Sequence, residues 1–282
     1  MKKKQKNSRK IGSIIAAIFF LAFVAIMDYP YVSRIINDKI QGAAVLSYEE
    51  EVAKMQEAAK QKLIDEAIAY NENLATGGFG VQDIELPSYE AIGEVYGALL
   101  AVGEDGIMGS IRIPKIDIKL PIYHGTTTQA LLDGSGHLEG SSLPIGGDST
   151  HTCISAHRGL PTKKMFTDLD LLDVDDVFYI DILGETLAYK IYEIETVRPS
   201  QVESLTIKEN EDLATLITCT PYGINDHRLF VHGYRIPYEE EIEAEIPILD
   251  KGFWINHWWI PTTILLIIWM IFILYKFNHK ND

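Results

Sequence analysis

Two long apolar stretches lie near the two ends of the chain. Residues 11–27 carry no charged side chain and follow a basic tail, and residues 258–275 begin with two tryptophans and end with a tyrosine. Each stretch is long enough to cross a bilayer as a helix, and tryptophan and tyrosine favour the membrane–water interface. The pattern predicts a transmembrane anchor at 11–27 and a second transmembrane helix at 258–275.

The region after the first apolar stretch has a helical pattern. In residues 47–70 apolar positions recur at helical spacing, and alanine, glutamate, lysine and leucine are frequent, which predicts an amphipathic helix. Glycine is then frequent from residue 71 to residue 109, which favours a long loop with short helical pieces. Long loops beside a compact domain often have a function, for example as a lid.

From residue 108 the pattern changes to short apolar or alternating runs that turn residues separate. Runs of this kind are typical of strands, and many of them at this spacing predict a sandwich or a closed barrel. Short helical insertions fit residues 128–132 and 164–172. The predicted strands are 109–113, 118–123, 152–157, 177–182, 187–197, 213–219 and 228–235.

These patterns also predict a topology. By the positive-inside rule the basic N-terminal tail is cytoplasmic, and a second crossing returns the C-terminal tail to the same side, so the region between the two lies outside the cell. That location also holds if the first stretch is a cleaved signal segment. The segments are a cytoplasmic tail (1–10), the anchor or signal segment (11–27), an N-terminal helix and lid (28–106), a β domain (107–238), an acidic linker (239–257), the second transmembrane helix (258–275) and a cytoplasmic tail (276–282).

Composition narrows the function. The external part has 17 basic and 39 acidic residues, a formal charge of −22, which disfavours nucleic acid as a partner because phosphate binding needs clustered lysine and arginine. The chain has two cysteines, too few for a disulfide-dense scaffold or a cysteine-rich metal site. Hydrophobic residues make up 47% of the chain, which excludes a disordered protein.

Three residues that can carry chemistry lie at ends of predicted strands. Cys219 ends one apolar run and His157 ends another, and a Cys–His pair is the minimum for thiolate chemistry. Arg228 begins the strand after Cys219. An antiparallel connection would bring its guanidinium beside the thiol, where it could stabilise an oxyanion. On position alone, a buried structural residue is the usual role of a free cysteine such as Cys219. A surface salt bridge fits the position of Arg228 as well as a catalytic role does.

Residues 215–235, TLITCTPYGINDHRLFVHGYR, resemble the active-site signature of the sortases, membrane-anchored cysteine transpeptidases of Gram-positive bacteria. SAHRG around His157 is similar to a family signature too, as are the upstream strings IPKIDIKLPIYHGT, HLEGSSLPIGG and KMFTDLDLL. The similarity covers about residues 107–238. TPYGINDHRL together with a C-terminal membrane span resembles class C, the pilus-assembling sortases.

The resemblance implies a mainly β fold, an eight-stranded sortase-type β-barrel with short helices. It implies Cys219 as the nucleophile, His157 as general acid/base, and Arg228 as the residue that stabilises the substrate and the oxyanion. Sortases of this class cut a Leu-Pro-X-Thr-Gly-like (LPXTG-like) sorting signal between Thr and Gly through a thioacyl-enzyme. A lysine amine of the next pilin then forms an isopeptide bond. No metal or organic cofactor is implied.

The resemblance also implies partners and a location. The substrates are pilins or surface proteins with LPXTG-like signals, and the acceptor is a lysine amine. The protein is expected in the cell membrane, as a two-pass protein with an extracellular catalytic domain. Thr218 and Thr220 flank Cys219 and are candidates for the substrate groove.

The lid departs from the family pattern. Class C sortases commonly carry an Asp-Pro-aromatic motif upstream of the barrel, and no Asp-Pro dipeptide occurs in this chain. The glycine-rich segment at the corresponding place offers other residues for a lid, and an open or differently closed site fits the sequence equally well. The candidate lid residues are Phe79, Asp83, Glu85 and Tyr89.

Other cysteine and histidine residues receive structural roles. Cys153 is four residues from His157 on one extended run, about 13 Å away, whereas a disulfide requires Cα atoms within about 7 Å. If His157 touches Cys219, we expect Cys153 to be a buried, inert thiol. His227 and His232 fit barrel packing or surface positions. His124, His137 and His151 are expected near turns and lack metal-ligand spacing.

Three alternatives stay open. A housekeeping-like sortase would attach proteins to peptidoglycan, although the C-terminal membrane span favours the pilus function. A membrane-tethered scaffold module would use Cys219 only structurally. A cysteine endopeptidase would use water as the final acceptor.

Overall fold

The computed structural model describes residues 2–77, 93–103, 105–240, 243 and 259–279. The chain divides into two compact units, residues 36–249 and a unit formed by residues 1–35 with residues 250–282. The first contains a β-barrel and the second contains two apolar helical segments.

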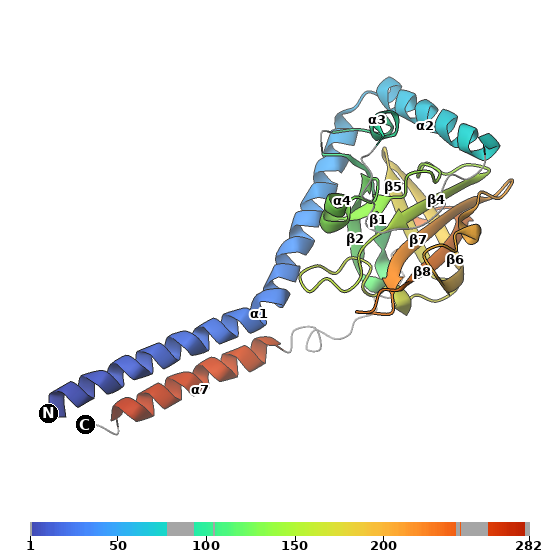
Figure 1. The fold of residues 1–282 in the computed structure, drawn as a ribbon. Coiled ribbons are helices and arrows are strands. Elements are labelled where there is room, and N and C mark those ends of the chain that lie inside the picture. The colour runs from blue at the N-terminus through green and yellow to red at the C-terminus, as the bar shows by residue number, and fades with distance from the viewer. Residues whose placement is uncertain (1, 78–92, 104, 241–242, 244–258, 280–282) are drawn as a thin grey trace. The chain divides into compact units, whose positions relative to one another are not determined.

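The barrel has eight strands, and the expected mainly β, eight-stranded barrel is confirmed (Figure 1). It closes in the order β1-β2-β3-β4-β7-β8-β6-β5. The β2–β3 and β4–β7 pairs are parallel and the others are antiparallel. The strands are β1 (Ile107–Ile113), β2 (Ile118–His124), β3 (Ser135–His137), β4 (Thr150–Ser155), β5 (Val177–Ile182), β6 (Glu185–Val197), β7 (Asp212–Thr220) and β8 (His227–Ile236).

Apolar side chains from all sides of the barrel form its core. Ile111, Ile154, Leu216 and Val231 are completely buried in one cluster. Burial of a side chain of this size stabilises the folded state by about 1.5–3 kcal/mol. Gly233 is needed at its position on β8, because a Cβ there would lie 2.7 Å from the Phe178 ring.

The seven predicted strands are present, with ends that differ by no more than two residues. The eighth, β3, was not among the runs predicted from hydrophobic pattern, because Ser-Gly-His has no apolar alternation. The helix at 128–132 is confirmed as α4 (Thr128–Asp133), where the Thr127 hydroxyl accepts a hydrogen bond from Ala130 N at 3.3 Å. The prediction of a helix at 164–172 is wrong, because the helical piece in that segment is a short 3₁₀ turn at Leu169–Leu171. The other 3₁₀ turns are Pro114–Ile116 and Glu203–Leu205.

The amphipathic helix expected at 47–70 is two helices. α1 (Lys2–Lys54) ends before Met55, and α2 (Glu57–Gly77) starts after Gln56. α2 also covers residues 71–77, which were expected to be loop. α3 (Glu94–Ala98) follows, and residues 78–92 between them lie outside the described part of the chain.

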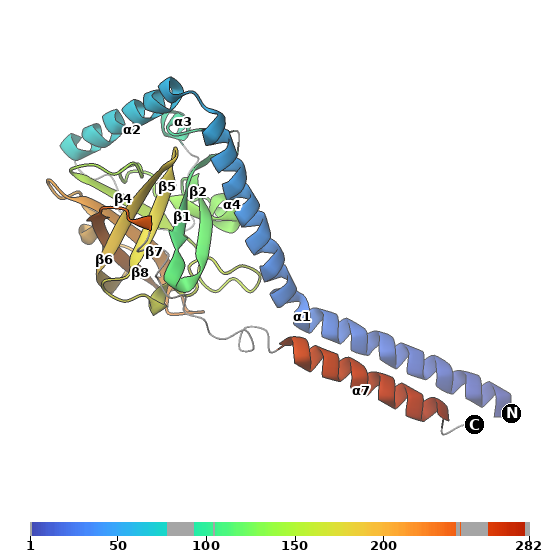
Figure 2. The same cartoon turned by 180° about the vertical axis from the view of Figure 1, so that it is seen from behind.

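The break between α1 and α2 lets each helix make its own contacts with the barrel. The C-terminal part of α1 runs beside β1 and β2 (Figure 2), where the Tyr48 hydroxyl donates to the Met108 carbonyl at 2.8 Å and accepts from Leu183 N at 3.0 Å. On α2, the Asn71 side chain donates to the Leu143 carbonyl at 3.2 Å and accepts from Leu143 N at 2.7 Å. A single straight helix would not satisfy both sets of contacts.

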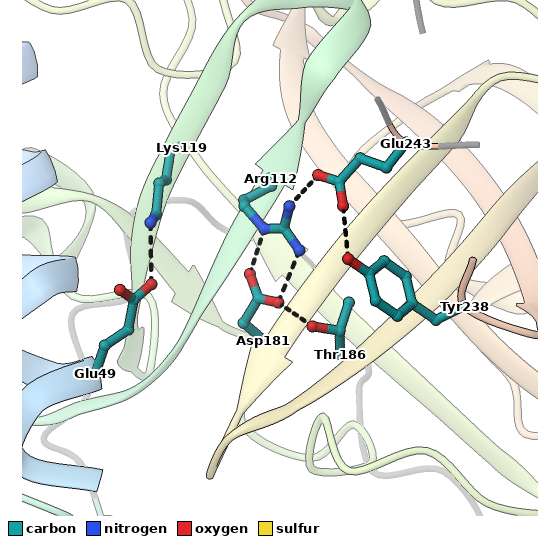
Figure 3. Close-up of polar contacts among 7 residues, drawn as sticks. All are labelled: Glu49, Arg112, Lys119, Asp181, Thr186, Tyr238 and Glu243. Atoms are coloured by element: carbon teal, nitrogen blue, oxygen red, sulfur yellow. Dashed lines mark hydrogen bonds and ion pairs between the residues drawn. The ribbon is translucent and has the colours of Figure 1, made fainter. Parts of the chain in front are cut away.

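A charged network outside the barrel holds the chain that follows β8 (Figure 3). Arg112 on β1 makes two hydrogen bonds with Asp181, at 2.5 and 2.9 Å, and it also pairs with Glu243. Tyr238 donates to the same Glu243 at 3.1 Å. The beginning of the acidic linker is therefore fixed to the barrel wall.

Two apolar helical segments pack together in the other unit. α7 (Trp259–His279) contacts the N-terminal part of α1, where Thr263 donates to Asp28 at 3.0 Å and Tyr31 stacks on Trp259 with ring centroids 5.5 Å apart. By length and composition, one helical stretch in the described residues could cross a membrane, Ile14–Lys54, and Trp259–Ile273 is a shorter apolar helix. A second crossing stays a prediction.

α3 is fixed to the barrel by a buried polar cluster. The Tyr96 hydroxyl lies 2.7 Å from His137 Nδ1 and accepts from Gly125 N at 3.1 Å, and His137 Nε2 lies 2.8 Å from the Ser142 carbonyl. Nε2 must donate to that carbonyl, and in a neutral imidazole Nδ1 then accepts from Tyr96. Burial favours the same neutral form and lowers the pKa of His137 to about 4.

Acid should destabilise the protein partly through this histidine. The pKa of His137 is about 4 in the folded chain and 6.5 ordinarily, so between these values only the unfolded chain takes up the proton. The free energy of unfolding should fall by up to about 1.4 kcal/mol per pH unit on this account. Urea unfolding of the full chain in detergent at pH 7 and pH 5 checks this. His137→Gln should lose this part of the pH dependence. Tyr96→Phe should lower the free energy of unfolding at both pH values and keep the pH dependence. Equal pH dependence in wild type and His137→Gln would contradict the assignment.

Candidate active site

Cys219 and Arg228 face each other across two neighbouring strands. In the antiparallel β7–β8 pair their Cα atoms are direct partners, and Thr220 pairs with His227 one step further. The loop between the strands is a compact turn in which the N–H groups of Ile224 and Asn225 donate to the Pro221 carbonyl at 3.1 and 3.0 Å. Asn225 has φ 62°, a conformation that asparagine tolerates better than most residues.

His157 reaches the same place from the other side of β7. β4 and β7 are parallel and keep one register from Thr150–Asp212 to Ser155–Ile217. Beyond the end of β4, Ala156 N still donates to the Ile217 carbonyl at 3.1 Å, and the Thr218 hydroxyl donates to the Ala156 carbonyl at 2.8 Å. His157 and Cys219 are the next residues of the two segments after Ala156 and Thr218.

His157 itself lies beyond the strand that was expected to contain it. The predicted strand 152–157 ends at Ser155, and the His157 carbonyl accepts a hydrogen bond from Phe166 N at 3.0 Å. The 158–166 loop therefore fixes the backbone of His157. Its imidazole is half-buried, and desolvation lowers its pKa below the ordinary value, so the neutral form dominates at pH 7.

The remaining two groups differ in exposure. Cys219 is half-buried, whereas Arg228 is 7% exposed. Arg228 Nη1 donates to the carbonyls of His227 and Asn225 at 3.1 and 3.3 Å. Cys219 and Arg228 thus lie on paired positions of β7 and β8, and His157 follows the last backbone contact of the β4 segment with β7. A thiol, an imidazole and a guanidinium are the groups that acyl transfer through a thioester uses.

Comparison with known proteins agrees with this arrangement. A family model described as "Sortase domain" matches residues 111–236. The crystal structure of sortase C1 from Streptococcus agalactiae is 45% identical, with a TM-score of 0.64, and the match covers 70% of this chain and 100% of that one. This chain belongs to the sortase family.

Two further similar proteins of the family are informative. The structure named sortase C1 of GBS Pilus Island 1 is 40% identical, with a TM-score of 0.63, and the match covers 71% of this chain and 94% of that one. The curated sortase A of Streptococcus agalactiae is 30% identical over 130 residues, which are 45% of this chain and 52% of that protein. This chain thus spans about half to two thirds of the length of the curated relatives it matches.

The two threonines beside Cys219 have different surroundings in this sortase. Thr218 is completely buried and its hydroxyl is engaged by Ala156, so the expectation that it lines a substrate groove does not fit the structure. It instead supports the segment that carries His157. Thr220 is half-buried, and its hydroxyl accepts a hydrogen bond from Arg158 Nη1 at 3.0 Å.

Arg158 was missed when candidate residues were chosen from the sequence. It follows His157 directly, its side chain is 7% exposed, and it forms an ion pair with Asp170. The sequence signal was its place inside the SAHRG string, but nothing in the string shows that this arginine turns inward. Beside it, Gly159 has φ 80° and approaches Tyr222, so that an added Cβ would lie 3.1 Å from the tyrosine ring.

The candidate lid residues lie outside the described part of the chain. They are Phe79, Asp83, Glu85 and Tyr89.

The other histidines are engaged in the fold. His232 is buried between the Thr215 hydroxyl at 2.7 Å and Glu195 at 3.1 Å, and His227 pairs with Asp226 at 2.8 Å. The three histidines expected near turns are buried, two of them on β3 and β4 and one at the end of β2. In the described ranges no three histidine, cysteine or carboxylate side chains cluster as a metal site would require.

Cys153 is a buried free thiol, as expected. It has no exposed surface, burial raises the pKa of its thiol, and neither cysteine is in a disulfide. It pairs with Thr215 on β7, four residues before Cys219.

The two thiols should therefore react at very different rates. In the native full chain, iodoacetamide should label Cys219 and leave Cys153 unmodified, since only the first is accessible, and both should react in denaturant. Mass spectrometry of the peptides checks this. Cys219→Ala should abolish native labelling and Cys153→Ala should not change it. Native labelling of Cys153 would contradict the burial.

Proposed function

We propose that this sortase is a membrane-anchored, pilus-assembling cysteine transpeptidase that cuts an LPXTG-like sorting signal between Thr and Gly. Cys219 is the nucleophile, His157 the general acid/base, and Arg228 the group that stabilises the substrate and the oxyanion. The observation that carries the proposal is the pairing of Cys219 with Arg228 across β7 and β8. The contacts of Ala156 with Ile217 and Thr218, one residue before His157 and Cys219, support it.

The first half of the reaction forms a thioester. Neutral His157 takes the thiol proton of Cys219, and the thiolate attacks the carbonyl carbon of the signal's threonine. Arg228 stabilises the negative charge that develops on the carbonyl oxygen. When the Thr–Gly bond breaks, protonated His157 gives its proton to the glycine nitrogen, which leaves as a free amine.

The second half transfers the acyl group. The neutral lysine amine of the next pilin attacks the thioester carbon, and His157 takes the proton that the nitrogen loses. The C–S bond breaks, the thiolate of Cys219 leaves, and an isopeptide bond joins the two proteins. The lowered pKa of His157 suits this step, because a neutral imidazole is needed as the base.

The choice of a lysine acceptor rests on similarity. The solved structures at 40–45% identity carry the name sortase C1, one of them from a pilus island, whereas the sortase A relative is 30% identical. The half-buried position of Cys219 at a strand end, compared with the fully buried Cys153, supports an enzyme over a scaffold in which Cys219 is structural.

The membrane arrangement belongs to the same proposal. The apolar part of α1 would anchor the protein, α7 would cross a second time, and the barrel would lie outside the cell. The hydrogen bond between Thr263 and Asp28 and the stacking of Tyr31 on Trp259 support this arrangement, because they pair the two apolar helices.

Incubation of the full chain in detergent with a Leu-Pro-X-Thr-Gly peptide should give a thioacyl adduct on Cys219, detected by mass spectrometry. Cys219→Ala should form none. His157→Gln and Arg228→Gln should slow acylation by about 10²-fold or more, since each removes proton transfer or charge stabilisation. Cys153→Ala is the matched control and should acylate like wild type.

The acceptor decides among the alternatives. A lysine-containing pilin peptide should convert the adduct to an isopeptide-linked product. Preferential transfer to a peptidoglycan-precursor amine would instead indicate a housekeeping sortase, and release by water alone an endopeptidase. Absence of any adduct from folded protein with a free Cys219 thiol would contradict the transpeptidase.

The topology can be tested separately in intact cells. A membrane-impermeant thiol reagent should label Cys219 but not the Cys219→Ala variant, because the barrel is expected outside. A C-terminal tag should be cut by added protease only after the membrane is permeabilised. Cleavage of the tag in intact cells would contradict the two-pass arrangement.

A further inference from the structure

Arg158 is a buried cation beside the Cys–His pair. Its side chain is 7% exposed. Nη1 donates to the Thr220 hydroxyl at 3.0 Å, Nη2 pairs with Asp170, and Nε is buried with no hydrogen-bond partner among the described residues. Removing a guanidinium from water is unfavourable, and a single carboxylate that is itself 45% exposed compensates for it only in part.

One partner of Arg158 connects the segment that carries His157 with the segment that carries Cys219. Arg158 follows His157, and Thr220 follows Cys219, so their hydrogen bond joins the two strand ends one residue beyond the proposed catalytic pair. One step before the pair, the Thr218 hydroxyl holds the Ala156 carbonyl. The pair therefore lies between two cross-links.

The two cross-links are not equivalent. The one through Thr218 lies beside the backbone hydrogen bond from Ala156 N to the Ile217 carbonyl, which continues the β4–β7 sheet, and Thr218 is completely buried. The one through Arg158 lies where β4 has ended and the chain has turned into the 158–172 loop, so no sheet hydrogen bonds fix the distance there. Asp170, on the 3₁₀ turn of that loop, holds the other arm of the guanidinium.

The geometry points to Arg158 as a positioning residue for acyl transfer: its guanidinium ties the end of β7 to the His157 loop and sets the distance between the Cys219 thiol and the imidazole. This inference rests on the proposed function of that pair. The guanidinium suits the task because its planar fork can hold a hydroxyl and a carboxylate at once, whereas a lysine amine is a single point.

Single-turnover acylation of the full chain by the sorting peptide tests this role. Arg158→Gln should lower the acylation rate at saturating peptide by about 10-fold or more, since small misplacement of reacting groups has effects of this size, and leave the KM unchanged. Thr220→Val should give a smaller loss, and the double variant should be no slower than Arg158→Gln, because both changes break one contact. Arg158→Lys should recover part of the rate.

Arg112→Gln is the matched control. Arg112 is also a partly buried arginine paired with two carboxylates, but it lies on β1, which neighbours β2 and β5 rather than β4, β7 or β8. The Arg112→Gln variant should have a lower melting temperature than wild type and the same acylation rate when folded. If Arg158→Gln does not fold, the acylation rate of Thr220→Val compared with that of wild type tests the positioning role instead.

The outcomes separate the two proposals. If wild type acylates, two results would overturn only the positioning role. One is an Arg158→Gln variant that acylates as fast as wild type, and the other is a double variant in which the two rate losses add. A rate loss matched by Arg112→Gln at equal melting temperature would also overturn it, because the effect would then be one of general stability. Wild type that forms no thioacyl adduct would overturn the transpeptidase, and the role of Arg158 with it.

Discussion

The pairing of β7 with two different neighbours is the constraint on which the candidate site depends. β7 is parallel to β4 and antiparallel to β8, and the backbone hydrogen bonds of both pairs fix its register. A slip by one residue on either side would turn every side chain of the displaced strand to the opposite face. Since alternate residues of all three strands belong to the apolar core, such a slip would be very unfavourable, so the packing of the barrel also holds Cys219 opposite Arg228.

The helices outside the barrel are attached by a few buried polar groups. Tyr48 on α1, Asn71 on α2 and Tyr96 on α3 each bond to backbone groups of the barrel. Buried polar groups of this kind need specific partners, so they define where each helix sits more sharply than apolar contact would.

Much of the fold could be predicted from the sequence because its strands are apolar runs bounded by turns. β3 could not be, since three residues without apolar alternation become a strand only through their neighbours. The division of the helix at Met55 also depends on tertiary contacts, because residues 47–70 have good helical periodicity throughout. Short segments such as 164–172 have too few residues for periodicity to distinguish a helix from a turn.

Some features of the candidate site could also be predicted from the sequence, and others could not. Cys219, His157 and Arg228 stand at strand ends in the sequence, and the resemblance to sortases assigned them roles. The burial of Thr218 and the inward turn of Arg158 depend on where β4 ends relative to β7, which a single sequence does not contain. Cys153 was predicted correctly because spacing along one strand is a local property.

The long crossover between β4 and β7 has a consequence for how this protein matures. His157 and Cys219 are separated by 62 positions, and they meet through a parallel pair whose connection includes β5 and β6. Contacts between such distant parts of a chain form slowly, because the intervening loop must be closed first. A newly made chain therefore has the Cys219 thiol far from His157, and the proposed catalytic pair can form only when the barrel has closed.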